Sequence, residues 1–130
     1  MQTRSIALSW ACQLVVAVIL GQTLFFKFTA APESVWIFST LGVEPWGRIA
    51  TGVIELISAL LVLVPRTAWL GAGLAAGTMA GAILSHLLFL GTEVMGDGGL
   101  LFGLAFAVLV AAGGVLWLHR AEVPVLRTAF

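Results

Sequence analysis

The sequence predicts an all-α integral membrane protein: an antiparallel four-helix transmembrane bundle with a short interfacial helix between its first two helices. Of the 130 residues, 61% are hydrophobic and 9% are charged, whereas soluble domains have about 45–50% apolar and about 25% charged residues. Four apolar stretches come close to the about 20 residues that a helix needs to cross a bilayer. Two of the three links between them are short, which favours antiparallel neighbours. We expect a single domain, residues 1–130.

The first two spans are predicted at about residues 6–26 and 46–64. Lys27 ends the first apolar run, and Pro65 with Arg66 ends the second. The first run is too long for the apolar region of a signal peptide, which has about 7–15 residues. We therefore expect it to be retained as a transmembrane helix.

The third and fourth spans are predicted at about residues 68–90 and 99–118. Gly91 ends the third span, and His119 with Arg120 ends the fourth. His119, next to an arginine at the end of an apolar run, is predicted to anchor the helix at the membrane interface.

The link between the first two spans is long enough to hold a short helix on the membrane surface. Pro32 indicates its start and Leu41–Gly42 its end. The apolar residues between them include Val35, Trp36 and Phe38, as in helices that lie in the membrane interface. Such a helix would cover the mouth of the bundle as a lid.

Basic residues near the span ends predict the orientation of the bundle. Lys27 and Arg48 fall on one side of the membrane. Four arginines fall on the other side: Arg4, Arg66, Arg120 and Arg127. Because cytoplasmic loops are enriched in Lys and Arg, we expect both termini to lie in the cytoplasm.

The charge and cysteine content argue against several classes of function. Six Lys plus Arg balance six Asp plus Glu, so no basic surface for nucleic acid is predicted. Cys12 is the single cysteine, which leaves no internal disulfide, no CxxC pair and no cysteine-based zinc cluster. His86 with Glu55 and Glu93 would be a poor set of metal ligands, and we predict no metal site.

Three glycines in the third span are spaced by four residues: Gly73, Gly77 and Gly81. Small residues at this spacing let two helices approach closely in a membrane. The first interpretation is tight packing inside this bundle. The alternative is a contact face for a second copy of the chain.

Glu55 is the residue of the second span that most needs a functional explanation. A charge at the bilayer centre costs at least about 2.5–3.5 kcal/mol, and Glu55 follows Trp46 by nine residues, which places it near the midplane. Arg48 precedes Glu55 by seven residues and lies on nearly the same helix face. With Thr51 and Ser58 these residues form a polar stripe, which we expect to face the other helices.

Polar residues from two further helices are expected in the same outer half of the bundle. Lys27 ends the first span there, Gln22 lies slightly deeper, and His86 lies near the end of the third span. With Arg48 and Glu55 they form a predicted pocket for a small polar or quinone-like head group, in which His86 and Glu55 transfer protons. The alternative is a buried ion pair and a hydrogen-bonded histidine that only fix the packing of the helices.

The order of these residues resembles the DoxX-like family of small four-helix membrane proteins, which is grouped with MauE-type maturation proteins. The resemblance covers about residues 6–118 and rests on Gly21–Lys27, Leu41–Gly42, Glu55–Leu56, Pro65–Arg66 and His86. It implies a redox-associated role, because family members are linked to thiosulfate:quinone oxidoreduction, to thiol-based oxidative-stress complexes and to the maturation of periplasmic dehydrogenases. It also points to Lys27, Glu55 and His86 as site residues. The architecture is similar to that of quinone-linked disulfide-forming enzymes, but this chain lacks their cysteine pair.

The first functional hypothesis is a DoxX-like inner-membrane subunit that binds a quinone or another small lipophilic ligand and supports a membrane or periplasmic oxidoreductase. Its candidate catalytic residues are Glu55 and His86, and its candidate ligand-binding residues are Gln22, Lys27, Arg48, Glu55 and His86. The second hypothesis is a non-catalytic assembly or scaffold protein that recruits a partner chain, or a second copy of itself, through its helix faces. A stand-alone enzyme with acid–base chemistry at Glu55 and His86 is a third possibility.

Overall fold

The computed structural model describes residues 3–121, and every regular element in this part of the chain is a helix. The elements are α1 (Thr3–Phe28), α2 (Pro32–Thr40), α3 (Trp46–Val62), α4 (Ala68–Ser85), the π-helical turn η1 (His86–Leu90) and α5 (Leu100–Leu118). The prediction of an all-α chain is confirmed for the described residues.

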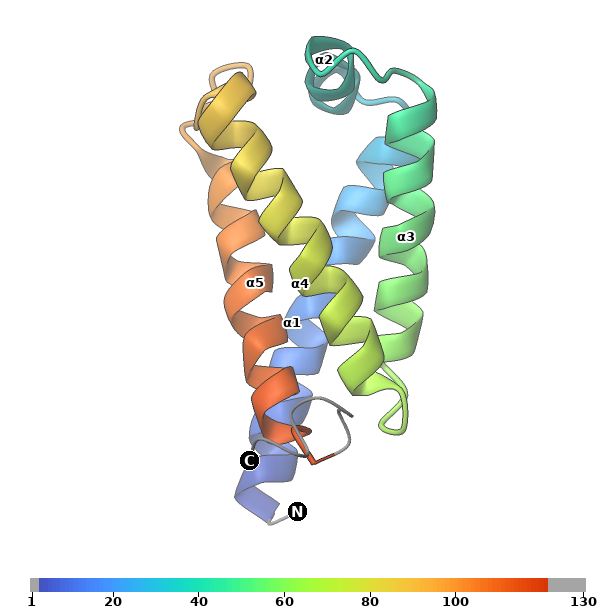
Figure 1. Ribbon diagram of the computed structural model, residues 1–130, viewed down its shortest axis with the longest axis vertical. Coiled ribbons are helices and arrows are strands. Elements are labelled where there is room, and N and C mark those ends of the chain that lie inside the picture. The colour runs from blue at the N-terminus through green and yellow to red at the C-terminus, as the bar shows by residue number, and fades with distance from the viewer. Residues whose placement is uncertain (1–2, 122–130) are drawn as a thin grey trace.

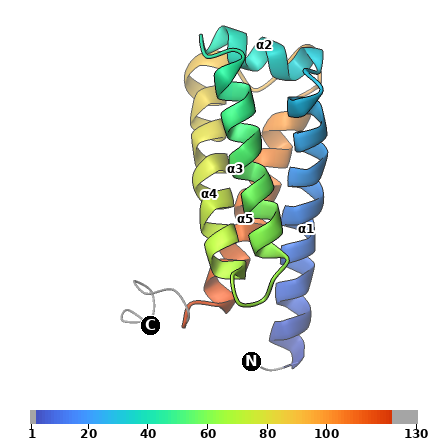
Figure 2. The ribbon, with the colours of Figure 1, turned by 90° about the vertical axis from the view of Figure 1, so that its right-hand side faces the viewer.

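Four long helices lie side by side, and the short helix α2 lies across one end of them (Figures 1 and 2). α1 packs against α3 and α5, and α4 packs against the same two helices. Successive long helices run in opposite directions, so the start of α1 and the α3–α4 turn share one end (Figure 1). We call the end with α2 and η1 the α2 end, and the other the opposite end.

Three helical segments are long and apolar enough to cross a membrane: Thr3–Phe28, Ala68–Leu90 and Leu100–Leu118. They match the first, third and fourth predicted spans. α3, in the place of the predicted span 46–64, has only 17 residues and falls short of the about 20 residues of a typical span. Its membrane crossing stays a prediction.

α3 turns its polar stripe toward the other helices. Arg48, Glu55 and Ser58 are buried, and Thr51 is half-buried. These positions recur every three or four residues, the period of one helix face. The opposite side of α3 carries exposed apolar residues, including Leu60, which is 59% exposed. The prediction that the stripe faces the other helices is confirmed.

The glycine that brings two helices together is Gly71. A Cβ atom there would lie 2.5 Å from the Val62 amide nitrogen and 2.7 Å from the Ser58 carbonyl oxygen of α3. A Cβ on Gly73, Gly77 or Gly81 would meet no atom within 4 Å. The prediction that these three glycines pack tightly inside the bundle is therefore wrong: all three are exposed, and no other helix of the described chain lies against them.

The opposite end contains a buried polar network. The Ser9 hydroxyl donates to Gln13 Oε1 at 2.6 Å and lies 2.8 Å from His119 Nε2, and Gln13 Nε2 donates to the Val62 carbonyl at 2.8 Å. His119 is 8% exposed. The prediction of an interfacial anchor is wrong for His119, because the ring turns inward, where Ser9 gives it a hydrogen-bond partner.

The basic residues near the helix ends are divided between the two ends of the bundle. Arg4, Arg66 and Arg120 belong to the opposite end, whereas Lys27 and Arg48 belong to the α2 end. Arg127, which also entered the orientation argument, lies outside the described residues.

Candidate functional site

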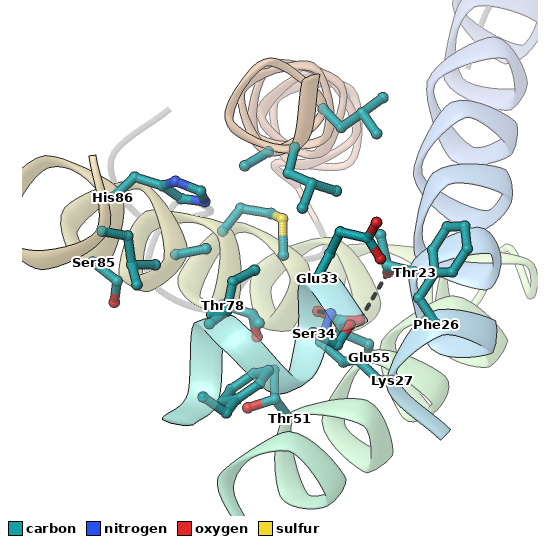
Figure 3. Close-up of a pocket in the computed structure, with 18 of the residues that line it drawn as sticks. Thr23, Phe26, Lys27, Glu33, Ser34, Thr51, Glu55, Thr78, Ser85 and His86 are labelled. Atoms are coloured by element: carbon teal, nitrogen blue, oxygen red, sulfur yellow. Dashed lines mark hydrogen bonds and ion pairs between the residues drawn. The ribbon is translucent and has the colours of Figure 1, made fainter. Parts of the chain in front are cut away.

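The α2 end of the bundle encloses a cavity of about 510 Å³. α1 and α3 form one side of it, α4, η1 and α5 form the other, and α2 covers it (Figure 3). Most of the wall is apolar, with Met79 and Leu104 among its residues. The polar side chains in the wall are Thr23, Lys27, Glu33, Ser34, Thr51, Glu55, Thr78, Ser85, His86 and Asp97.

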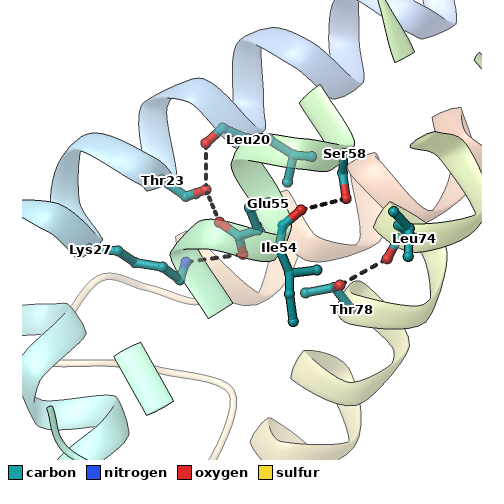
Figure 4. A network of polar contacts seen from close by, with 8 residues as sticks. All are labelled: Leu20, Thr23, Lys27, Ile54, Glu55, Ser58, Leu74 and Thr78. Atoms are coloured by element: carbon teal, nitrogen blue, oxygen red, sulfur yellow. Dashed lines mark hydrogen bonds and ion pairs between the residues drawn. The ribbon is translucent and has the colours of Figure 1, made fainter. Parts of the chain in front are cut away.

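Glu55 is held by two side chains of α1 at the wall of this cavity. Lys27 Nζ lies 3.1 Å from Glu55 Oε1, and the Thr23 hydroxyl lies 2.9 Å from Glu55 Oε2 (Figure 4). Glu55 is 2% exposed and Lys27 is 14% exposed at their side chains. The same Thr23 hydroxyl lies 2.9 Å from the Leu20 carbonyl, so its proton is shared between two acceptors. Each charge therefore has an opposite charge beside it, as burial in a bilayer requires.

The α1–α3 spacing that permits this pair depends on Gly52. A Cβ at Gly52 would lie 2.8 Å from the Phe28 ring of α1. Since Gly52 precedes Glu55 by three residues, one helical turn, it lets α3 approach α1 where the ion pair forms. Thr23 and Lys27 are four residues apart and so share one face of α1.

α2 contributes the cover of the cavity. Pro32 occupies its first turn, where the missing amide proton costs nothing. Ser34 and Phe38 are buried beneath it, while Trp36 is 37% exposed on its outer surface. Glu33 lines the cavity from the first turn of α2. The predicted short helix after the first span is present, with bounds close to those expected.

His86 lies on the wall opposite Glu55, at the first residue of η1. The Gly91 amide donates to the His86 carbonyl at 2.7 Å, the wide spacing of a π-helical turn. His86 Nδ1 lies 2.9 Å from the Gly91 carbonyl oxygen, and in the tautomer with a proton on Nδ1 it donates to that oxygen. The His86 ring also contacts the Phe102 ring edge-on, with ring centroids 5.4 Å apart. Within residues 3–121 no hydrogen bond joins His86 to Glu55. Proton transfer between them would need a ligand or water in the cavity.

Arg48 does not reach Glu55. Its Nε donates to Glu44 Oε1 at 2.8 Å, and its Nη1 donates to the Lys27 carbonyl. Arg48 is buried at the junction of α1 and α3, but it is not among the residues of the cavity wall. By meeting a carbonyl at the end of α1, its positive charge offsets the negative end of that helix.

Gln22 is exposed on α1, outside the cavity wall. The neighbouring residue Thr23 occupies the place that the sequence argument gave to Gln22. Consecutive helical residues point about 100° apart, so an error of one position changes the face. Thr23 was missed, although its spacing of four residues from Lys27 was a usable signal.

Asp97 lines the cavity from the loop before α5. Its carboxylate accepts hydrogen bonds from the amides of Val94, Gly99 and Leu101, at 2.8–3.1 Å. Burial alone raises the pKa of Asp97, but these amide donors outweigh burial and lower the pKa below its ordinary value. The carboxylate therefore stabilises the loop and the first turn of α5.

This arrangement suits an amphipathic molecule of moderate size. The cavity volume falls in the range of about 300–1,000 Å³ that is common for small-molecule sites. The Lys27 ammonium is a hydrogen-bond donor and the Glu55 carboxylate an acceptor, both on one wall. The remaining wall is largely apolar and offers van der Waals contact to a ring or a chain.

The sequence profile of the DoxX-like family matches residues 11–113. No curated protein and no solved structure matches the chain. The match extends from the first half of α1 to the last turns of α5, and so includes Lys27, Glu55 and His86. The chain therefore belongs to the DoxX-like family, and with its long apolar helices it is a multi-pass membrane protein.

Proposed function

We propose that this chain is an inner-membrane subunit that binds a quinone, or another small lipophilic molecule with a polar head group, in the cavity beneath α2. A partner oxidoreductase in the membrane or periplasm exchanges electrons with the bound molecule. The chain itself supplies the binding site and the buried charges.

The observation that carries this proposal is the ion pair of Lys27 and Glu55 beside unfilled space. A pair that served only to hold α1 against α3 would need no cavity next to it. Here the ammonium and the carboxylate stand at the wall of a cavity of about 510 Å³. A carbonyl oxygen of a ligand accepts from Lys27, and a hydroxyl donates to Glu55. His86, on the other wall, is the candidate proton carrier.

The placement in the membrane is part of the same proposal. α3 crosses the membrane as the second of four spans, α2 lies at the outer interface, and both termini are cytoplasmic. The three arginines described at the opposite end, against Lys27 and Arg48 at the α2 end, support this orientation through the enrichment of basic residues in cytoplasmic loops. The cavity then opens in the outer half of the bilayer.

The direct test compares Glu55→Gln with Glu44→Gln. Both variants remove a carboxylate that pairs with a basic residue, but only Glu55 lines the cavity. Binding of decylubiquinone to the protein in lipid nanodiscs is measured by quenching of tryptophan fluorescence. We expect Glu55→Gln to weaken binding by about tenfold or more, the equivalent of one lost charged hydrogen bond, and Glu44→Gln to leave it unchanged.

His86→Ala tests the second wall of the cavity. We expect the folded variant to lose the activity of the partner enzyme in native membranes. Full activity in both Glu55→Gln and His86→Ala would mean that the ion pair and the histidine only hold the helices together.

One observation favours a second function, a scaffold that recruits a partner chain or a second copy of itself. The face of α4 with Gly73, Gly77 and Gly81 is open, and small residues in membranes favour helix contacts. Under this alternative, Gly77→Leu breaks a complex isolated from native membranes, whereas Glu55→Gln leaves it intact. The reverse result supports the ligand-binding function.

A further inference from the structure

α3 and α4 touch near the opposite end of the bundle and separate toward the α2 end. Their contact is fixed at Gly71, where even one added carbon would lie 2.5 Å from the backbone of α3. From this point α4 leans toward α5, and the distance to α3 widens along its length (Figure 1). The two helices are therefore close at Gly71 and farther apart toward the α2 end.

The face of α4 that meets α3 at Gly71 continues into the cavity wall. Thr78 follows Gly71 by seven residues and Ser85 follows Thr78 by seven more, so all three lie on one helix face. Thr78 and Ser85 line the cavity and are half-buried. Thr51 faces them from α3 and is also half-buried (Figure 3).

Small side chains form the rim on this side of the cavity. Between Thr78 and Ser85, α4 lines the cavity with the buried Met79 and with two small residues, the exposed Gly81 and the half-buried Ala82. The Thr78 and Ser85 hydroxyls donate to carbonyls of their own helix at 2.8 and 2.9 Å, so they present no unpaired proton to lipid. An apolar chain can therefore lie across this rim without burying an unpaired polar group.

The other sides of the cavity carry larger groups. Where α1 faces α5, most of the wall consists of bulky side chains: Ile19, Leu20, Phe26, Leu101 and Leu104, with Thr23 and Ala105 as the smaller ones. At the end of the bundle, α2 covers the cavity with the buried Phe38. The rim between α3 and α4 is thus the side on which the side chains are smallest.

We propose that the cavity is reached sideways from the lipid between α3 and α4, and that its ligand carries an apolar tail that lies across Gly81. The head group then meets Lys27 and Glu55, while the tail extends into the bilayer. This inference rests on the proposed function and narrows its ligand to the class of tailed, membrane-dissolved molecules.

The test uses Gly81→Leu, with Gly73→Leu as its matched control. Both glycines are exposed on α4 with no atom within 4 Å of an added Cβ, so both variants should fold. Only Gly81 lines the cavity. We expect Gly81→Leu to weaken the binding of decylubiquinone by about tenfold. The same benzoquinone ring without its alkyl tail should bind the variant and the wild type alike.

Three outcomes would overturn this inference, and they can be told apart. Equal binding of decylubiquinone by Gly81→Leu and Gly73→Leu would rule out the sideways access. The proposed function survives in that case if Glu55→Gln still weakens binding. Equal loss of both probes in Gly81→Leu means that the substitution disturbs the head-group site instead. Failure of the wild type to bind either probe ends the proposed function and this inference together.

Discussion

At the opposite end of the bundle, buried polar side chains form a hydrogen-bonded network beside a small hollow, whereas at the α2 end an ion pair lies beside a larger, covered cavity. Ser9, Gln13 and His119 join α1, α3 and the end of α5 through hydrogen bonds of 2.6–2.8 Å. The hollow beside them is smaller, about 340 Å³, and is bordered by the exposed Arg66. Glu55 and Lys27 are equally well paired, but a space of about 510 Å³ adjoins them.

This comparison shows which buried polar groups in a membrane bundle are candidates for function. Burial alone does not decide it, since Gln13 and Glu55 are both 2% exposed. Hydrogen bonds between helices stabilise a bundle by about 1 kcal/mol each, and this is enough to explain the opposite end. The α2 end differs because a buried ion pair adjoins the larger cavity, which α2 covers, whereas the hollow beside Ser9, Gln13 and His119 is smaller. Substitutions in the network at the opposite end should therefore change stability alone, whereas substitutions of the ion pair at the α2 end should also change ligand binding.

The largest effect on stability is expected from Lys27→Met. This change leaves the Glu55 carboxylate buried without its cation, at a cost of about 3 kcal/mol or more in the free energy of unfolding. Unfolding in detergent with increasing denaturant measures the loss. The double variant Lys27→Met with Glu55→Gln should recover most of it. A double variant as unstable as the single one would contradict the idea that an unpaired charge is the cause.

A smaller effect is expected from Gly71→Ala, which tests the closely packed half. The added carbon would lie 2.5 Å from the Val62 nitrogen, so α3 or α4 must shift, at a cost of about 1–3 kcal/mol. Gly73→Ala, two residues away, meets no atom and should be neutral or stabilising by up to about 1 kcal/mol. Thermal unfolding of the two variants gives the comparison. Equal melting temperatures would show that the two helices do not meet at Gly71.

The smallest effect is expected from Asp97→Ala at the cavity end of α5. Loss of the amide-bound carboxylate should cost about 1 kcal/mol at neutral pH. Because the pKa of Asp97 in the folded protein lies below its ordinary value of 3.8, its stabilisation is complete above that pH. The stabilisation is lost as the pH falls through the lowered pKa, so wild type and variant should converge in acid.

Glu93→Ala is the control for this measurement. Glu93 lies on the same loop, is exposed and accepts one longer bond, 3.3 Å, from the Gly98 amide. Its removal should change the melting temperature less than the removal of Asp97. If Asp97→Ala and the wild type show the same dependence of stability on pH, another group causes the loss of stability in acid.

Much of the fold could be predicted from the sequence, because long apolar runs and their stops fix where helices begin and end. The helix at 32–40 followed from Pro32 and from the Leu41–Gly42 stop. The site was predicted less completely. Glu55 and Lys27 emerged from the cost of buried charge, and the structure pairs them. Arg48 shares the face of Glu55, but a long side chain can turn along its helix, and it meets Glu44 instead.

The contacts between helices were the part that the sequence could not provide. Four-residue spacing marked Gly73, Gly77 and Gly81 as a smooth face, but it does not tell which neighbour that face meets. The close approach occurs at Gly71, whose partners Ser58 and Val62 lie on another helix. Likewise, Thr23 becomes part of the site only because α3 brings Glu55 to it.

The π-helical turn at His86 also presents a ridge of large apolar side chains to the surroundings of the bundle. A wider turn holds more residues per turn, so consecutive side chains diverge less than in an α-helix. Leu87, Leu88 and Phe89 follow one another and are 61%, 69% and 71% exposed. In water such a ridge would promote aggregation, whereas in a bilayer it anchors η1 among acyl chains. In the proposed placement, His86, on the inward side of the same turn, lies below the headgroups, and the mouth of the cavity meets acyl chains rather than water.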